Sequence, residues 1–155
     1  TNIYGSFDKF DEERAHVVPS LIRRALNREH PFEVWGTPSV VRDFIFVDDL
    51  VDDILSILKG EVDVNGLQIN ICSGVPMTIK EATEIILEIC NYKTEIYFNP
   101  EKPSAIPYRT VDNSRYVQLF GDRKRTPFKV GIEKTVEWYK KIKQKNLIHK
   151  YDIMI

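Results

Sequence analysis

The sequence predicts one small domain of mixed α/β structure. Its 155 residues can enclose a single ordinary hydrophobic core, but not two complete domains. Amphipathic stretches with a helical period alternate along the chain with short runs of aromatic and β-branched residues, which are typical of strands. No internal repeat or low-complexity linker interrupts this alternation.

The apolar spacing places the elements of the first half. A strand end running into a loop is expected before His16, because the first residues show no helical period. An apolar stripe from Val18 to Leu26, with Pro19 suited to a first helical position, predicts a helix that ends near Asn27. Short strands are expected over 31–36 and 43–47.

Two acidic residues open the next predicted helix, which is apolar from Leu50 to Leu58 and stops at Gly60. Asp48 or Asp49 is expected to cap it, because a carboxylate there bonds free N–H groups and contributes about 1 kcal/mol. We expect this structural role in preference to a catalytic acid pair.

The second half begins with an expected buried strand over 67–74. Thr78 and Glu81 then form a T-x-x-E capping box before a helix over 79–90. Beyond it we expect a strand over 94–98, a proline-rich loop over 99–109, a helix from Asn113 or Ser114, and a last helix over 131–146. The apolar ending, 147–155, is expected to dock on the domain or on a partner.

Composition argues against several classes of partner. The charges nearly balance, with 22 Lys and Arg against 23 Asp and Glu, which disfavours nucleic acid. No apolar run approaches the ~20 residues of a membrane span, and the N-terminus lacks a basic region followed by an apolar one. Cys72 and Cys90 lie in apolar settings and are expected to be free, buried thiols. A cytoplasmic location is therefore expected.

Four cations have no evident role in the helices or strands. Arg42 precedes an apolar strand, and it either pairs with a neighbouring Asp or holds an anion. Arg24, Lys102 and Arg109 are, taken singly, surface charges, but together with Arg42 they are the groups that a diphosphate requires. Trp35 belongs either to the core or beside a sugar or base.

His16 stands just before a predicted helix start, where it serves either as a capping or packing residue or as a neutral imidazole ready to exchange protons. No cluster of His, Cys and carboxylates has the spacing of metal ligands, so a metal site is not expected. The sequence also lacks the G-x-G-x-x-G, P-loop and G-x-S-x-G motifs, so a cofactor-binding glycine turn is not expected in these residues.

Several blocks, taken in order, resemble a known family. These are NIYG, HVVPSLIRR, VWG-x5-RDFIFVDD, INICSGVPMTIKE, FNPEKPSAIPYRTVDNSR and GIEKTVEWY. They are similar to the C-terminal half of the extended short-chain dehydrogenase/reductases that act on nucleotide sugars, the NAD-dependent nucleotide-sugar epimerase/dehydratase family. Within this family the HVVPSLIRR and VWG-x5-RDFIFVDD blocks most resemble the GDP-L-fucose synthases.

The resemblance implies a two-domain oxidoreductase whose N-terminal Rossmann domain binds NADP or NAD and is absent from this sequence. Residues 1–146 would form the smaller, nucleotide-sugar-binding domain with remnants of the last Rossmann strands, and 147–155 a tail of unknown role. The implied reaction is epimerisation of a 4-keto-6-deoxy sugar nucleotide followed by hydride reduction. The complete enzyme would be a homodimer, and this part alone would be inactive.

The same resemblance assigns roles to single residues. His16 corresponds to the acid that returns a proton during epimerisation, and neither Cys72 nor Cys90 matches the family's cysteine base. The diphosphate would be held by Arg42, and Lys102 would reach the nucleotide. The remaining substrate-binding positions are Asn2, Val17, Arg24, Trp35 and Arg109.

Two departures from the family pattern concern the substrate. Ser6 replaces the usual proline after NIYG, and Lys102 to Ala105 read KPSA where Lys-Pro-Asp-Gly is usual. The base and the sugar can therefore differ from GDP and fucose. Three alternatives stay open: half of a nucleotide-sugar 4-epimerase or 4,6-dehydratase, a non-catalytic nucleotide-sugar-binding module, and an isolated, self-associating fragment.

Overall fold

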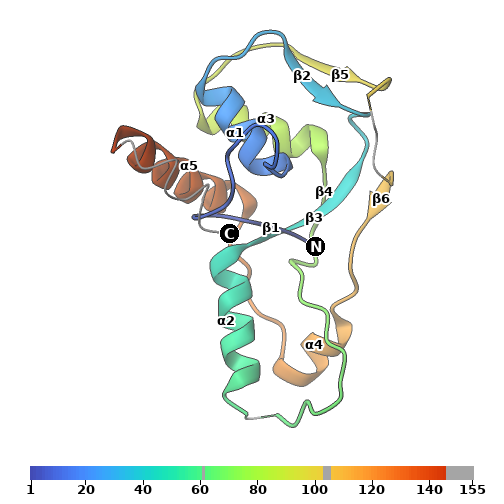
Figure 1. The fold of residues 1–155 in the computed structure, drawn as a ribbon. Coiled ribbons are helices and arrows are strands. Elements are labelled where there is room, and N and C mark those ends of the chain that lie inside the picture. The colour runs from blue at the N-terminus through green and yellow to red at the C-terminus, as the bar shows by residue number, and fades with distance from the viewer. Residues whose placement is uncertain (61, 103–105, 146–155) are drawn as a thin grey trace.

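The computed structural model describes residues 1–60, 62–102 and 106–145, and it confirms a mixed α/β fold. Figure 1 shows helices α1, α3 and α5 with strands β2 and β5 on one side of strands β1 and β3, and helices α2 and α4 on the other. The elements are β1 (Asn2–Tyr4), α1 (Val17–Leu26), β2 (Phe32–Trp35), β3 (Val41–Phe46), α2 (Val47–Leu58), β4 (Pro76–Thr78), α3 (Ile79–Ile89), β5 (Ile96–Asn99), β6 (Tyr108–Arg109), α4 (Ser114–Phe120) and α5 (Phe128–Gln144).

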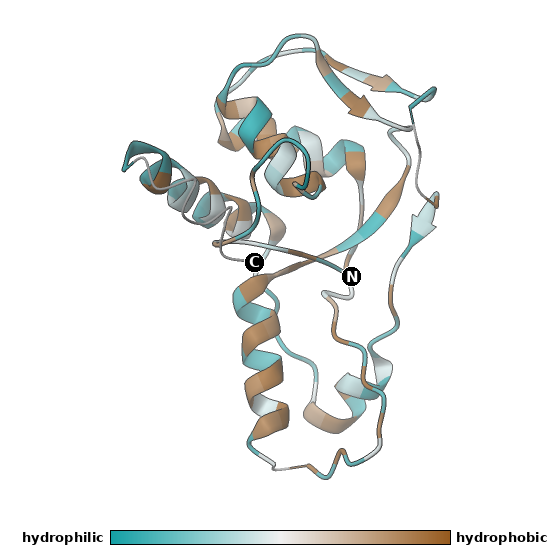
Figure 2. Ribbon diagram, viewed as in Figure 1, coloured by the Kyte–Doolittle hydropathy of each residue, from teal (hydrophilic) through white to brown (hydrophobic). Residues whose placement is uncertain are grey.

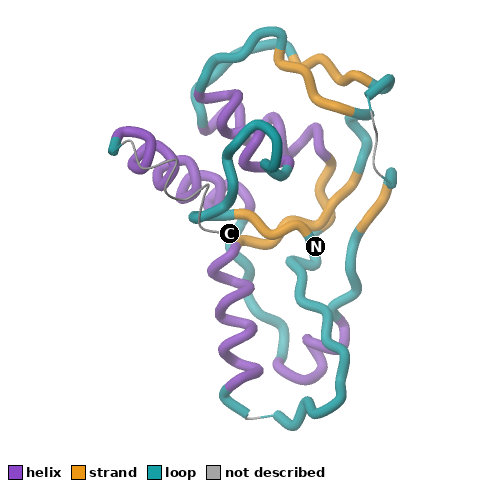
Figure 3. Tube along the Cα trace, viewed as in Figure 1, coloured by secondary structure: helices purple, strands orange, loops and turns teal. Residues whose placement is uncertain are grey.

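Strand β3 organises the main sheet. Its C-terminal half pairs in parallel with β1, and its N-terminal half pairs with β4 in antiparallel and β6 in parallel orientation. In the β3–β6 pair, Arg42 lies opposite Arg109. Strands β2 and β5 form a separate parallel pair (Figure 3), and the register of this pair places Trp35 opposite Asn99. Residues far apart in the sequence are thereby brought side by side.

The main core lies between α1, α3 and α5. Ile22, Ala25, Ile86 and Ile132 are fully or almost fully buried there, and each large apolar side chain removed from water contributes about 1.5–3 kcal/mol. Figure 2 shows hydrophobic residues, in brown, on α1 and α3, and the buried ones among them belong to this core. The core thus fixes the start of α1, where His16 lies.

Most predicted elements are confirmed. Helix α1 begins at Val17, so Pro19 lies in its first turn, and it ends before Asn27 as expected. The capping box of α3 is complete, because the Glu81 N–H donates to Thr78 Oγ1 at 3.1 Å and the Thr78 N–H donates to Glu81 Oε2 at 2.8 Å. Both cysteines are free and buried, and burial raises the pKa of the Cys90 thiol to about 11.

The strand expected over 67–74 is wrong. This segment pairs with no strand among the described residues, and several of its hydrogen bonds involve side chains instead. The Asn70 amide donates to the Asp112 carbonyl, and the Asp43 carboxylate accepts the N–H groups of Ser73 and Gly74. An apolar pattern alone does not make a strand, because a strand also needs a neighbour with which its backbone can form hydrogen bonds.

The capping role expected for Asp48 or Asp49 is also wrong. Strand β3 runs into α2 without a loop, so Phe46 holds the N-cap position and both acids fall in the first turn. The Asp49 carboxylate instead accepts the Thr126 N–H and hydroxyl, at 2.8 Å each. It thereby ties α2 to the segment before α5. The ending 147–155, for which docking was expected, lies outside the described residues.

Candidate functional site

His16 and Asn2 line one cavity of about 460 Å³, here called the His16 cavity. Strand β1 and the loop after it form most of its wall, and α2 contributes Val47. Gly5 is required in this wall, because its φ is +152° and an added Cβ would collide with the Val47 side chain. The remaining lining residues are Thr1, Ile3, Tyr4, Ser6, Phe7 and Asp8.

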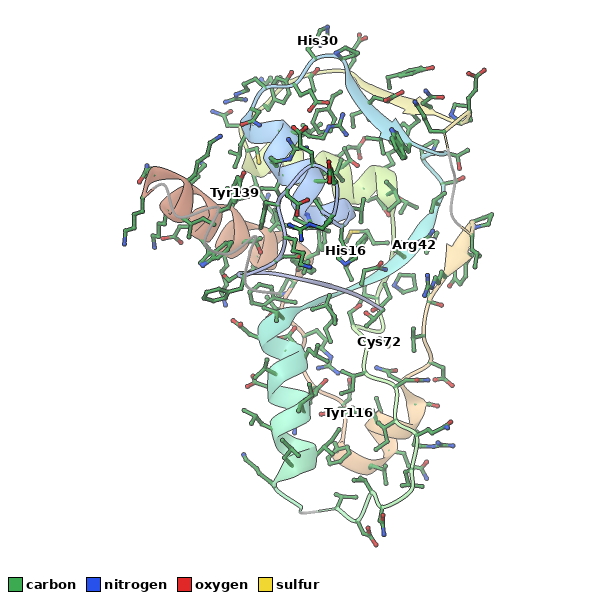
Figure 4. The ribbon with its side chains drawn as sticks, viewed as in Figure 1. His16, His30, Arg42, Cys72, Tyr116 and Tyr139 are labelled. Carbon is green, nitrogen blue, oxygen red and sulfur yellow. The ribbon has the colours of Figure 1, made fainter. Side chains whose placement is uncertain are left out.

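The backbone holds His16 at the N-cap of α1, but its side chain forms no capping hydrogen bond. The capping role left open from the sequence is therefore wrong. The side chain is exposed, and Figure 4 shows it beside the start of α1. An imidazole in this place can meet a ligand that enters the cavity.

Asn2 is fixed by the main sheet. Its side-chain amide donates to the Asp43 carbonyl at 3.0 Å, across the β1–β3 pair. Asp43 is almost fully buried, and its carboxylate also accepts the Thr1 hydroxyl at 2.6 Å. The N-terminal wall of the His16 cavity is thus anchored to β3.

Arg42 and Arg109 form a second group. Only 7% of Arg42 is exposed, and its Nη1 donates to the carbonyls of Val41 and Ile106 at 2.6 and 2.8 Å. Among the described residues, neither guanidinium has an ion-pair partner. The pairing with a neighbouring Asp that the sequence left open is therefore not formed. Burial, and then the charge of Arg109, lower the pKa of Arg42. Two adjacent cations without a carboxylate attract an anion.

Trp35, Lys102 and Arg24 gather around Glu33, a residue that sequence reasoning missed. The Lys102 ammonium lies 5.6 Å from the centre of the Trp35 ring, and 59% of Trp35 is exposed, so Trp35 is not a core residue. A hydrogen bond from Asn99 is the main cause that lowers the pKa of Glu33, helped by Trp35 and by the charges of Lys102 and Arg24. The alternation in FEVW already places Glu33 on the Trp35 face.

The remaining assigned residues have partners of their own. The Arg24 guanidinium pairs with Glu29 at 2.8 Å and lies 5.0 Å from the centre of the Phe32 ring. Val17 is partly buried and packs against the main core. The structure thus brings together His16 with Asn2, Arg42 with Arg109, and the Glu33 group, while Val17 stays apart.

Other kinds of site receive no support from the described residues. None of their His, Cys, Asp and Glu side chains form a group of three that could hold a metal. No helix among residues 1–60, 62–102 and 106–145 is long and apolar enough to cross a bilayer. A second hollow, of about 730 Å³, lies beside α3 and β5 and contains none of the assigned residues in its lining.

Comparison with known proteins gives consistent matches. Residues 1–72 match the NAD dependent epimerase/dehydratase family. A probable GDP-L-fucose synthase 1 from Oryza sativa subsp. japonica is 35% identical over 144 residues, which are 90% of this chain and 43% of that protein. The chain therefore spans less than half the length of this curated relative.

Solved structures agree on the fold. A GDP-L-fucose synthetase from Naegleria fowleri bound to NADP superimposes with a TM-score of 0.82 at 23% identity, covering 93% of this chain and 46% of that one. A GDP-D-glycero-L-gluco-heptose synthase from Campylobacter jejuni, solved in the presence of NADPH, gives 0.75 at 27% identity, with 91% and 51% covered.

Proposed function

Because this chain belongs to the NAD-dependent epimerase/dehydratase family, we propose that it forms the nucleotide-sugar-binding part of an NAD(P)-dependent epimerase/reductase of the GDP-L-fucose synthase type. The observation that carries this proposal is Arg42. Its guanidinium is buried, has no carboxylate partner among the described residues, and lies opposite Arg109 in the β3–β6 pair.

A diphosphate would complete the Arg42–Arg109 pair. Nη1 of Arg42 already donates to two backbone carbonyls, which fix the plane of the guanidinium. Its other N–H groups donate no hydrogen bond to the described residues and remain for phosphate oxygens. Lys102, stacked on Trp35, would meet the nucleotide side of the substrate.

His16 would act at the sugar. After a base elsewhere in the protein removes the proton next to the ketone, the imidazole would return a proton to the opposite face of that carbon. Cys72 and Cys90 are buried, so neither supplies that base. Asn2 would contact the sugar or its phosphate from the wall of the His16 cavity. Val17, Arg24 and Arg109 complete the proposed substrate-binding set.

When bound, NAD(P) supplies the hydride that reduces the ketone. The described residues offer no glycine-rich turn for dinucleotide phosphates, so the cofactor would be held mainly by residues outside this sequence.

The test measures the affinity of the complete natural polypeptide for GDP and UDP after Arg42→Ala. Loss of a charge-assisted contact is expected to weaken binding of the diphosphate by about 2 kcal/mol, or roughly 30-fold. Guanosine and uridine, which lack phosphate, should bind the variant and the unchanged protein alike.

Two further variants complete this test. Arg28→Ala is the control, because Arg28 donates to the Asn91 carbonyl and stacks on Tyr92, away from the Arg42–Arg109 pair. Arg42→Lys keeps the charge but loses the planar fork, so its affinity for the diphosphate should fall between that of the unchanged protein and that of Arg42→Ala. Unchanged diphosphate affinity in a folded Arg42→Ala variant would falsify the proposal.

A further inference from the structure

The His16 cavity contains a carboxylate that the proposed function does not use. Asp8 lies in its lining together with His16. Oδ1 of Asp8 accepts the N–H of Lys9 at 2.8 Å, whereas Oδ2 is buried and has no hydrogen-bond partner among the described residues. Leaving a buried polar atom unpaired is unfavourable, so such an atom calls for a partner.

His16 is in place to be that partner. Burial raises the pKa of the Asp8 carboxyl, while the Lys9 N–H and then the charge of His16 act in the opposite direction. The two side chains are therefore close enough to interact. The imidazole of His16 forms no hydrogen bond to the residues that the structure describes, so its ring N–H is also free to be donated.

We propose that Asp8 is a positioning residue for His16, whose ring N–H it accepts on Oδ2 when a ligand enters the His16 cavity. This inference rests on the proposed function of His16 as a proton donor. With one ring N–H donated to the carboxylate, the neutral ring is held in a single tautomer whose other nitrogen faces the ligand. That second nitrogen carries the proton to be returned when the ring is an imidazolium, and Asp8 keeps it aimed at the ligand. The backbone of His16 is already fixed at the start of α1, so only the ring remains to be oriented.

The first test reads the imidazole itself. In the complete polypeptide labelled with ¹⁵N-histidine and saturated with GDP, the ¹⁵N shifts report which ring nitrogen carries the proton. The His16 signal is assigned by its loss in His16→Gln. One tautomer should dominate in the unchanged protein, and Asp8→Asn and Asp8→Ala should both give a mixture.

Asp11→Asn is the matched control. Asp11 lies on the same loop as Asp8 and accepts the N–H groups of Glu13 and Arg14, but it does not line the His16 cavity. Its variant should keep the tautomer of the unchanged protein. An Asp8→Ala spectrum identical to that of Asp11→Asn would overturn the inference.

Turnover separates this inference from the proposed function. Asp8→Asn should lower kcat about 10-fold with little change in KM, because ring orientation affects the transition state more than substrate binding. Asp8→Glu should restore part of the lost rate. Full activity of His16→Gln would overturn the role of His16 in the proposed function, whereas the ¹⁵N spectrum would still report whether Asp8 orients the ring.

Discussion

Asp53 in α2 and Arg42 in β3 are both buried charges, but they have opposite surroundings. Asp53 is fully buried, accepts the Tyr116 hydroxyl at 2.6 Å, and forms ion pairs with Arg125 at 2.6 Å and Arg123 at 3.8 Å. Arg42 has two backbone carbonyls and the like charge of Arg109 around it. A buried charge that is neutralised within the chain supports structure, whereas one without an opposite charge is suited to binding.

The two centres also differ in place. Asp53 and its partners connect α2 to α4 and to the segment after it, and Figure 4 shows Tyr116 in this lower part of the molecule. Both guanidiniums near Asp53 also lie over the Tyr116 ring, at 5.6 and 6.0 Å from its centre. Asp53 and its partners thus hold α4 in place without any ligand. Arg42, in contrast, lies on the strand that borders the proposed site.

Removing Asp53 should give the largest effect on stability. Asp53→Ala leaves Arg125, itself largely buried, without its partner, and we expect a loss of about 3–5 kcal/mol in the free energy of unfolding. Denaturant unfolding of the complete polypeptide measures this loss. Asp52→Ala, at the exposed neighbouring position, should change the free energy by less than ~0.5 kcal/mol. Equal unfolding midpoints for Asp53→Ala and Asp52→Ala would show that the paired charge of Asp53 does not stabilise the fold.

The hydrogen bond from Tyr116 to Asp53 should make part of this stability depend on pH. Burial, followed by the hydrogen bond to Asp53, raises the pKa of Tyr116 to about 12. Because ionisation is harder in the folded than in the unfolded chain, this contribution is complete below pH ~10 and is lost as the pH rises toward 12. Tyr116→Phe should therefore lower the free energy of unfolding by about 2 kcal/mol at pH 8. The difference between the variant and the unchanged protein should be smaller at pH ~11.

The measurement is unfolding by guanidinium of the unchanged protein and of Tyr116→Phe, at pH ~8 and at pH ~11. Tyr97→Phe on β5 is the control, because 55% of Tyr97 is exposed, and it should change the free energy by less than ~0.5 kcal/mol throughout. A gap for Tyr116→Phe that stays constant from pH 8 to 11 would show that the ionisation of Tyr116 is not linked to folding.

The sequence predicts those parts of the fold that local patterns determine. Helix α3 follows from the spacing of its apolar residues and from the Thr78–Glu81 box, and both are confirmed. The segment 67–74 shows the limit of such patterns. Its apolar residues suggest a strand, but the N–H groups of Ser73 and Gly74 bind the Asp43 carboxylate, which is distant in the sequence.

The candidate site shows the same limit. Arg42 and Arg109 could be singled out as cations, but only the register of β3 with β6 shows that they are neighbours. Asp8 has no local signal, because its importance comes from a buried oxygen that has no partner among the described residues, on a side chain that lines the His16 cavity. Residue types can thus be chosen from the sequence, while their unsatisfied charges and hydrogen bonds appear only in the folded chain.

The smallest predicted effect compares a paired with an unpaired cation at the proposed site. Arg24 already has Glu29 at 2.8 Å, whereas Arg109 is exposed and has no ion-pair partner in the described ranges. We expect Arg109→Ala to weaken GDP binding about 10-fold, or about 1.4 kcal/mol, and Arg24→Ala to weaken it less than ~3-fold. Titration at low and high salt measures both, and the Arg109 effect should shrink with salt because exposed charges are screened. A larger loss for Arg24→Ala would mean that a ligand can displace Glu29, so that pairing in the free protein does not decide which cations bind.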